Sequence, residues 1–212
     1  MRQWDALYSF LDAGEAQRAA AFRQDVDRRL FVAAHGGLRL LAGEAMGRAP
    51  QALTFSIGPK GKPFCGGSGL EFNLSHSGGV VLIALSRDVP MGIDVERARS
   101  APDHLQIARR YFHANEAAEL VSLDEPEAEA AFFRCWTRKE AFIKALGDGL
   151  SMPLDSFRVS CLPGSPAMVL SLPASCVPAP WTLLDLSPAE GHFGALAMAR
   201  QGAAVSLRSL AF

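Results

Sequence analysis

The stretch Met91–Glu96, with the sequence MGIDVE, carries the strongest indication of fold and function in this chain. Its alternating pattern predicts a β-strand, on which side chains two positions apart share a face. Asp94 and Glu96 would therefore lie side by side at the end of the strand. Two adjacent carboxylates repel each other, and a hard divalent cation such as magnesium relieves that repulsion. Two solvated acids at a strand end are the alternative interpretation.

The composition is that of an ordinary globular protein. Of the 212 residues, 49% are hydrophobic and 20% are charged, and the formal net charge is -1. This length suits one large domain or two small ones. A nearly neutral chain has no general attraction for nucleic acid, so we expect no nucleic-acid partner and a recognition of phosphate that depends on local clusters.

Targeting and redox features predict a cytoplasmic protein without membrane association. No apolar run approaches the roughly 20 residues that cross a bilayer. The N-terminal residues 1–5 lack the layout of a secretory signal. We interpret the cysteines as reduced and structural, because none of them shows the CxxC spacing of a metal site. They are Cys65, Cys135, Cys161 and Cys176.

The hydrophobic periodicity changes from helical to strand-like twice along the chain. Helical spacing covers residues 12–48 and, with breaks near 113–115 and 124–126, residues 102–147. Strand-like segments follow each block, at 53–57, 70–74, 79–85, 91–95, 157–160, 168–172, 181–186 and 192–199. This order predicts an α+β fold of two similar halves, residues 1–100 and 101–212, related by a pseudo-two-fold axis. A ligand cleft is expected at their seam.

A second carboxylate stands out in the segment Phe132–Gly147, which has helical periodicity and ends at a glycine. On a helical wheel, Glu140 falls within the aromatic stripe that contains Trp136, the face expected to meet the core. An ionised carboxylate in that position needs a proton, a partner or a metal ion. The alternative is a surface pair with Lys144, one turn later, worth roughly 0.2–0.5 kcal/mol.

The segment Phe72–Gly79, with the sequence FNLSHSGG, predicts a strand followed by a loop at its serine, histidine and glycines. Backbone amides and the side chains of Ser75 and His76 could donate hydrogen bonds to a phosphate there. The G-x-S-x-G context of a hydrolase nucleophile is missing. Ordinary turn residues are the alternative interpretation.

Taken together, these stretches resemble the motifs of 4'-phosphopantetheinyl transferases. GIDVE at residues 92–96 and WTRKEAFIK at 136–144 resemble the paired hallmarks of that family. Their spacing and the two-half layout are similar to the larger, surfactin-synthetase-activating type, a pseudo-dimeric monomer. The resemblance extends over about residues 25–160, with further matching stretches at 61–64, 72–77, 109–116 and 149–157.

The resemblance implies a reaction and a set of roles. Coenzyme A is the implied substrate, and phosphopantetheine passes from it to a serine of an apo acyl or peptidyl carrier protein, releasing 3',5'-ADP. Magnesium, or else manganese, would be held by Asp94, Glu96 and Glu140. Glu140 would also act as general base, and Lys144 would neutralise the pyrophosphate.

The resemblance also implies contacts to coenzyme A. Ser75 and His76 match positions that bind its phosphates, and Lys62 matches a position beside the adenosine. Arg28 or Arg29 would contact the 3'-phosphate, since guanidinium groups suit phosphate well. For both arginines, a solvated helix face is the alternative.

An acidic carrier would be complemented by a basic patch on this protein, and charged helix faces serving solubility alone are the alternative. The candidates for such a patch are Arg109, Arg110, Arg134, Arg138 and Lys139. Two other functions stay open from the residues: a non-catalytic module that binds coenzyme A or a carrier, and a different magnesium-dependent phosphotransferase or nuclease. The near-neutral charge disfavours a nuclease.

Overall fold

The computed structural model describes residues 3–58, 61–99, 103–147, 152–174, 176 and 179–210. The first part of the predicted motif at residues 149–157, as far as residue 151, therefore lies outside the described residues. In the parts of the chain that are described, no helix is both long and apolar enough to cross a membrane. Cys65, Cys135 and Cys161 are buried thiols that form no disulfide, as the sequence predicted.

Three helices open the chain. They are α1 (Gln3–Phe10), α2 (Ala13–Ala21) and α3 (Asp25–Met46), so the predicted helical block is divided before residue 25. Asp12 begins α2 with a capping box. Its side chain accepts a hydrogen bond from the Glu15 backbone N–H, and the Glu15 carboxylate accepts one from the Asp12 backbone N–H. Gly36 does not interrupt α3. A Cβ atom there would lie 2.5 Å from the carbonyl oxygen of Leu7, so the glycine lets α1 pack closely against α3.

The remaining elements follow the predicted order. The first group of strands is β1 (Ser56–Ile57), β2 (Pro63–Phe64), β3 (Leu70–Ser77), β4 (Val80–Arg87) and β5 (Met91–Arg97). The second helical block forms α4 (His104–Tyr111), α5 (Ala114–Val121) and α6 (Glu127–Leu146). The last strands are β6 (Arg158–Val159), β7 (Val169–Ser171), β8 (Thr182–Leu186) and β9 (His192–Met198). Short 3-10 turns at Pro50–Ala52 and Leu154–Ser156 precede two predicted strands, which are shorter than predicted, since β1 begins at Ser56 and β6 at Arg158.

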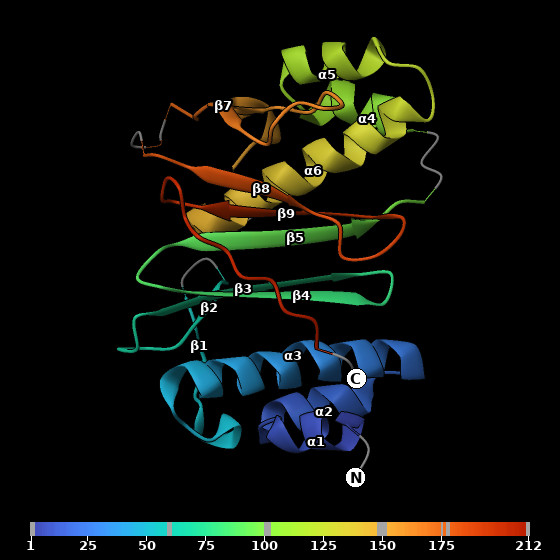
Figure 1. Cartoon of the computed structure of the whole chain (residues 1–212). Coiled ribbons are helices and arrows are strands. Elements are labelled where there is room, and N and C mark those ends of the chain that lie inside the picture. Colours follow the sequence, from blue (N-terminus) through green and yellow to red (C-terminus); the bar gives the residue numbers. More distant parts are fainter. Residues whose placement is uncertain are drawn as a thin grey trace.

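The elements form layers in an α+β architecture, which confirms the predicted fold class (Figure 1). Helix α3 covers the β3–β4 hairpin, and α6 packs on the antiparallel sheet of order β5-β9-β8. Each of these two sheets thus has one long helix against it. Because β5 pairs with β9, it belongs to the second sheet, and the strand pairing favours a boundary in the sequence between β4 and β5, before the predicted one at residue 100. In space, the seam lies where the β3–β4 hairpin contacts β5.

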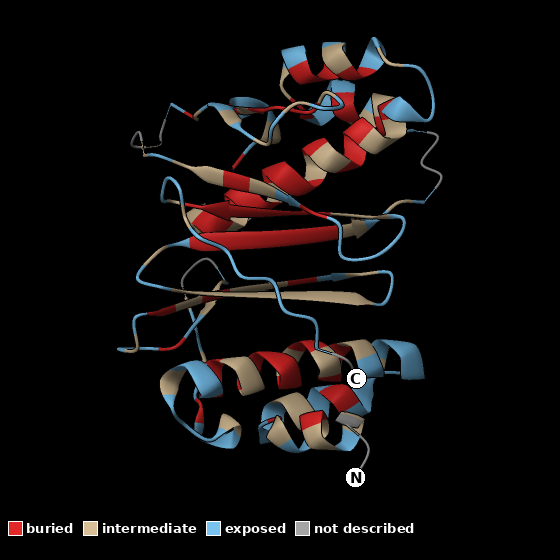
Figure 2. Ribbon diagram, in the orientation of Figure 1, coloured by how far each residue is buried: buried red, intermediate tan, exposed pale blue. Residues whose placement is uncertain are grey.

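The main core surrounds α6, which is buried on several sides (Figure 2). Phe132, Phe133, Phe142 and Phe157 form its aromatic centre, with Phe142 and Phe157 completely buried. Beneath the helix, Ala195 and Ala197 of β9 belong to this core. A smaller cluster joins α1 to α3 around Leu7.

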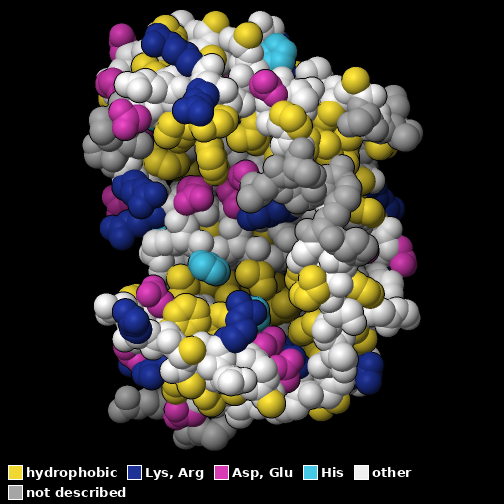
Figure 3. Space-filling model, turned by 180° about the vertical axis from the view of Figure 1, so that it is seen from behind, with side chains coloured by type: hydrophobic (Ala, Val, Ile, Leu, Met, Phe, Trp, Pro, Cys, Tyr) yellow, Lys and Arg dark blue, Asp and Glu magenta, His cyan; other side chains and the backbone are white. Residues whose placement is uncertain are grey.

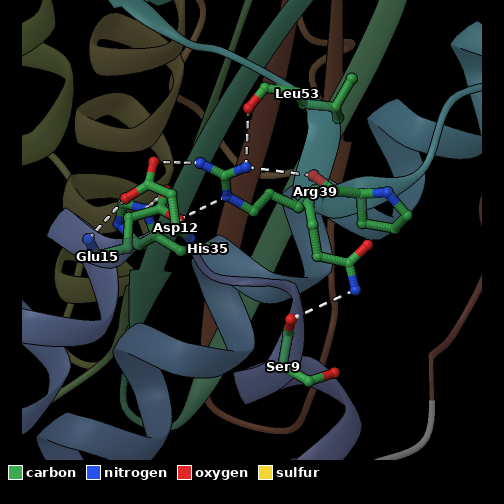
Figure 4. A network of polar contacts seen from close by, with 8 residues as sticks. Ser9, Asp12, Glu15, His35, Arg39 and Leu53 are labelled. Carbon is green, nitrogen blue, oxygen red and sulfur yellow. Dashed lines mark hydrogen bonds and ion pairs between the residues drawn. The ribbon is translucent and has the colours of Figure 1, made fainter.

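A buried arginine ties the first helices to the chain that leads into the sheet (Figure 4). Arg39 on α3 is completely buried. Its Nε atom donates to Glu15 Oε2 at 2.5 Å, and its guanidinium also pairs with Asp12. The remaining donors reach the carbonyl oxygens of Pro50 at 3.2 Å and Leu53 at 3.0 Å. One side chain therefore pairs with the start of α2, the 3-10 turn at Pro50 and the residue Leu53 that follows this turn.

The same network shifts the ionisation of Glu15. Burial raises the pKa of this carboxyl, but hydrogen bonds from His35 and Arg39, one from the Asp12 backbone and the nearby Arg39 charge outweigh burial and lower the pKa from 4.5 to about 2. Because the folded pKa lies below the unfolded value, ionised Glu15 stabilises the fold above pH 4.5. That contribution is lost as the pH falls from 4.5 towards 2.

We predict that Glu15→Gln lowers the free energy of unfolding at pH 7 by about 3 kcal/mol and flattens its fall in acid. Urea unfolding at a series of pH values measures both effects. Glu44→Gln serves as control, because Glu44 is an exposed residue of the same helix as Arg39. If the Glu15 variant kept the wild-type dependence on pH, the Arg39 network would not set the acid stability.

Candidate active site

Helix α6 lies directly on β5 because Gly92 has no side chain. A Cβ atom at this position would stand 2.2 Å from the carbonyl oxygen of Ala141 and 2.4 Å from the backbone nitrogen of Ala145. No other residue fits at that separation without moving one of the two backbones. The close contact brings the side chains of Glu140 and Lys144 on α6 towards the carboxylates of β5.

Lys144 reaches the first of these carboxylates. Its Nζ atom lies 2.6 Å from Asp94 Oδ1, 3.3 Å from Ser75 Oγ and 3.3 Å from the carbonyl oxygen of Ile93. The Asp94 side chain is 5% exposed and the Lys144 side chain 29%. The pair therefore forms a cationic and anionic centre that water reaches mainly from the lysine side.

Asp94 offers a free ligand atom at this centre. Its Oδ1 atom accepts hydrogen bonds from Ser75 Oγ at 2.9 Å and from Lys144, whereas Oδ2 is buried and has no hydrogen-bond partner among the described residues. Buried polar atoms are normally satisfied. A carboxylate oxygen without a donor suits a hard cation such as magnesium, and the neighbouring Glu96 offers the same ligand type.

Glu140 faces the two strand carboxylates. Burial is the main cause that raises its pKa, repulsion by Asp94 and Glu96 adds to it, and Lys144 opposes it. Among the described residues, however, no three His, Cys, Asp or Glu side chains are already close enough to hold a metal ion. The three acids share one electrostatic environment, and a cation that bridged them would draw their side chains together.

The predicted contacts to coenzyme A divide into two groups. Lys62 lies at the site, with Nζ 3.2 Å from the carbonyl oxygen of Met91 and 3.7 Å from Glu71 Oε2. His76 is exposed on β3, next to Ser75. By contrast, the first turn of α3 holds both predicted arginines in local ion pairs with Asp25. They are Arg28 and Arg29.

Seen from behind, the surface is indented between the part that carries α3 and the part that carries α6 (Figure 3). Acidic, basic and histidine side chains gather beside this indentation. The seam between the sheets is thus polar and open to solvent on this side.

Comparisons with known proteins agree with this geometry. The 4'-phosphopantetheinyl transferase superfamily matches residues 90–185, the segment that holds β5 and α6. The 4'-phosphopantetheinyl transferase HetI of Nostoc sp. (strain PCC 7120) is 36% identical over 204 residues, which cover 94% of this chain and 83% of that protein. The chain belongs to the 4'-phosphopantetheinyl transferase family.

Other relatives carry the same description. A 4'-phosphopantetheinyl transferase of Bacillus subtilis is 31% identical over 156 residues, covering 73% of this chain and 68% of that protein. The transferase AcpT of Salmonella typhi is 37% identical over 183 residues, covering 82% and 91% of the two chains. The protein is therefore an enzyme of the transferase class, and phosphopantetheine transfer is its general activity.

Two details of the sequence-based prediction for the transferase are wrong. Ser75 and His76 lie within β3, and the turn begins only at Gly78. Glu140 lies in line with Trp136, as the helical wheel placed it, but this line of α6 is only half-buried. The wheel overestimated its burial because α6 is buried on several sides and part of its buried surface is polar.

The buried polar residues on α6 also remove two candidates from the predicted carrier-binding patch. Arg138 is completely buried and donates to both carboxylate oxygens of Asp185, at 2.7 and 2.6 Å. Lys139 is equally buried, 2.8 Å from Glu116. Sequence patterns gave no indication of these pairs, because the partners lie far apart along the chain. Arg138 and Lys139 hold the core together and face no partner protein.

We predict that Gly92→Ala lowers the free energy of unfolding by about 1–3 kcal/mol, the usual range for an overpacked core. It should lower transfer as well, because α6 and its functional side chains must move away from β5. Chemical denaturation and an activity assay measure the two effects.

Gly66→Ala is the matched control, since the nearest atom to a new Cβ there is 3.8 Å away, on Phe64. Equal stability of the two variants would contradict the close contact at Gly92.

Proposed function

We propose that this protein transfers the 4'-phosphopantetheine group of coenzyme A to a serine hydroxyl of an apo acyl or peptidyl carrier protein, with magnesium, or else manganese, as the metal. The observation that carries this proposal is the buried, unsatisfied oxygen of Asp94 beside Lys144. A site for a diphosphate needs both a cation and a ligand for a divalent metal, and this one offers both.

In the reaction, the serine oxygen forms a bond to the β-phosphorus of coenzyme A, and the bond from that phosphorus to the oxygen of 3',5'-ADP breaks. Asp94, Glu96 and Glu140 are the proposed metal ligands, and bound magnesium would neutralise charge on the pyrophosphate. Glu140 accepts the proton of the serine hydroxyl, directly or through a water molecule. General bases of this kind contribute roughly 10²–10⁴-fold.

The basic and hydroxyl side chains would bind the rest of the substrate. Lys144 would turn from Asp94 to a pyrophosphate oxygen, and Ser75 and His76 would donate to phosphate. Lys62 would lie beside the adenosine. For Arg28 or Arg29 to bind the 3'-phosphate, their ion pairs with Asp25 would have to exchange for the phosphate.

The carrier protein would meet the half of the molecule that holds α6. Arg109 and Arg110 remain exposed there, beside Tyr111, whose side chain is 46% exposed. Cationic and aromatic groups of this kind would complement an acidic helical carrier. We further propose that the enzyme works as a monomer, because a single chain supplies both sides of the seam. We also propose that it works in the cytoplasm.

A direct assay tests the proposal. The purified protein is incubated with coenzyme A, magnesium and a panel of apo-carriers, and each carrier is weighed by mass spectrometry. We expect at least one carrier to gain one phosphopantetheine group. If no carrier gained mass at any magnesium or manganese concentration, the proposal would be overturned. Binding of coenzyme A without transfer would favour the non-catalytic binding module instead.

Glu140→Gln should separate activity from stability. The raised pKa means that ionising Glu140 is unfavourable in the metal-free fold, so its stability cost grows as the pH rises above the ordinary value of 4.5. We therefore predict that Glu140→Gln abolishes most transfer and raises the melting temperature of the metal-free protein.

Asp94→Asn provides the contrast to Glu140→Gln. It should also abolish most transfer, but it should lower the melting temperature, because it breaks the ion pair with Lys144. Activity assays and thermal unfolding in the presence of a chelator measure both properties. Full activity in either variant would remove that carboxylate from the proposed site.

A further inference from the structure

Strands β3 and β5 face each other across the seam through side chains. Asn73, Ser75 and Ser77 alternate along β3, so their side chains share one face. The opposite edge of β5 is paired with β9 through the backbone. Three β5 backbone N–H groups on the seam side donate instead to side chains of β3. They are Ile93 to Asn73 Oδ1 at 2.8 Å, Val95 to Ser75 Oγ at 3.3 Å, and Arg97 to Ser77 Oγ at 3.1 Å.

Two of these side chains also bind the proposed metal ligands. Ser75 Oγ donates to Asp94 Oδ1 at 2.9 Å, and Ser77 Oγ donates to Glu96 Oε2 at 2.9 Å. A hydroxyl has one proton to donate and two lone pairs to accept with. Because Ser77 accepts the backbone N–H of Arg97, its single proton is directed at Glu96. The strand that lies across the seam thereby orients the carboxylate.

We propose that Ser77 is a positioning residue, which holds the Glu96 carboxylate in the orientation that binds the metal ion. This inference rests on the proposed function. Ser77 is separate from the residues assigned to coenzyme A, unlike Ser75, which also lies 3.3 Å from Lys144. Apart from its seam bond to the Arg97 backbone, Ser77 would thus affect metal binding through Glu96.

The orientation matters because Glu96 is only half-buried, near the end of β5. Ordering a glutamate side chain costs rotamer freedom, and a partner that already holds the side chain reduces that cost on metal binding. The hydrogen bond from Ser77 engages one oxygen and leaves the second for a cation. Loss of such a partner behind a metal ligand typically weakens metal affinity about 10–100-fold.

Asn73 offers a matched control for this proposal. Like Ser77, it accepts one backbone N–H across the seam, that of Ile93, but among the described residues its side chain bonds to no carboxylate. Asn73→Ala therefore removes a seam hydrogen bond and leaves Glu96 oriented. Ser77→Ala removes a seam bond and the bond to Glu96 together. The two variants separate the stability of the seam from the positioning of the metal ligand.

The test measures metal binding directly. The full-length protein is titrated with Mn²⁺ in the presence of coenzyme A, and free Mn²⁺ is followed by electron paramagnetic resonance. We expect Ser77→Ala to weaken the affinity for Mn²⁺ by about 10-fold or more. Asn73→Ala and the conservative variant Ser77→Thr should bind it like the wild type.

Activity gives a second readout of the same variants. In Ser77→Ala, the magnesium concentration for half-maximal transfer should rise, whereas kcat at saturating magnesium and the KM for the carrier should change little. Wild-type affinity for Mn²⁺ in Ser77→Ala, or an equal loss in Asn73→Ala, would overturn the proposal. A failure of Ser77→Thr to restore binding would overturn it too.

Two controls keep the outcome decisive. If Ser77→Ala did not fold, Ser77→Cys would replace it, because a thiol keeps the shape of the side chain but donates only weakly. Wild-type affinity in that variant would also overturn the positioning role. A wild type that neither binds Mn²⁺ nor transfers phosphopantetheine would refute the proposed function itself. A normal wild type with unaffected Ser77 variants would refute the positioning role alone.

Discussion

The contact between the backbones of α6 and β5 is the constraint on which the rest of the structure depends. Gly92 permits it, because any side chain would collide with the carbonyl oxygen of Ala141. Because the α6 backbone lies directly against β5, Lys144 comes within 2.6 Å of Asp94. The same seating buries α6 on several sides, and its inward cations consequently need the internal partners Asp185 and Glu116.

Charge balance at the seam follows from this packing. Asp94 accepts a hydrogen bond from Lys144, on the helix that packs against its own sheet, and one from the hydroxyl of Ser75, on the other sheet. These two groups satisfy one oxygen and leave the second unsatisfied. Burial raises the pKa of Glu140, and the same negative field raises it further. The metal-free site thus holds more negative charge than its own residues neutralise, which is the condition that favours binding of a divalent cation.

Much of the fold could be predicted from the sequence, because strands such as MGIDVE alternate clearly and glycines end the long helices. The same stretches also pointed to the acids of the site. The extent of β3 could not be predicted: Ser75 and Ser77 have the composition of a loop, but their backbones pair with Leu82 and Val80 of β4. Their hydroxyls also accept β5 backbone donors some twenty residues away, which no local pattern reveals. Arg39 was missed for a similar reason, since no periodicity reveals a buried arginine whose partners come from several segments.

The polar seam explains why the site can be both stable and reactive. A backbone ladder would hold two strands about 4.8 Å apart and use every donor between them. Side chains in that role keep the β5 donors satisfied while their own protons remain available to the carboxylates. An apolar seam would pack more firmly, but it would take from buried Asp94 the hydroxyl donor Ser75 and leave Lys144 as its donor. The hydroxyls that join the two sheets are therefore the same ones that hold the carboxylates of the proposed cation site.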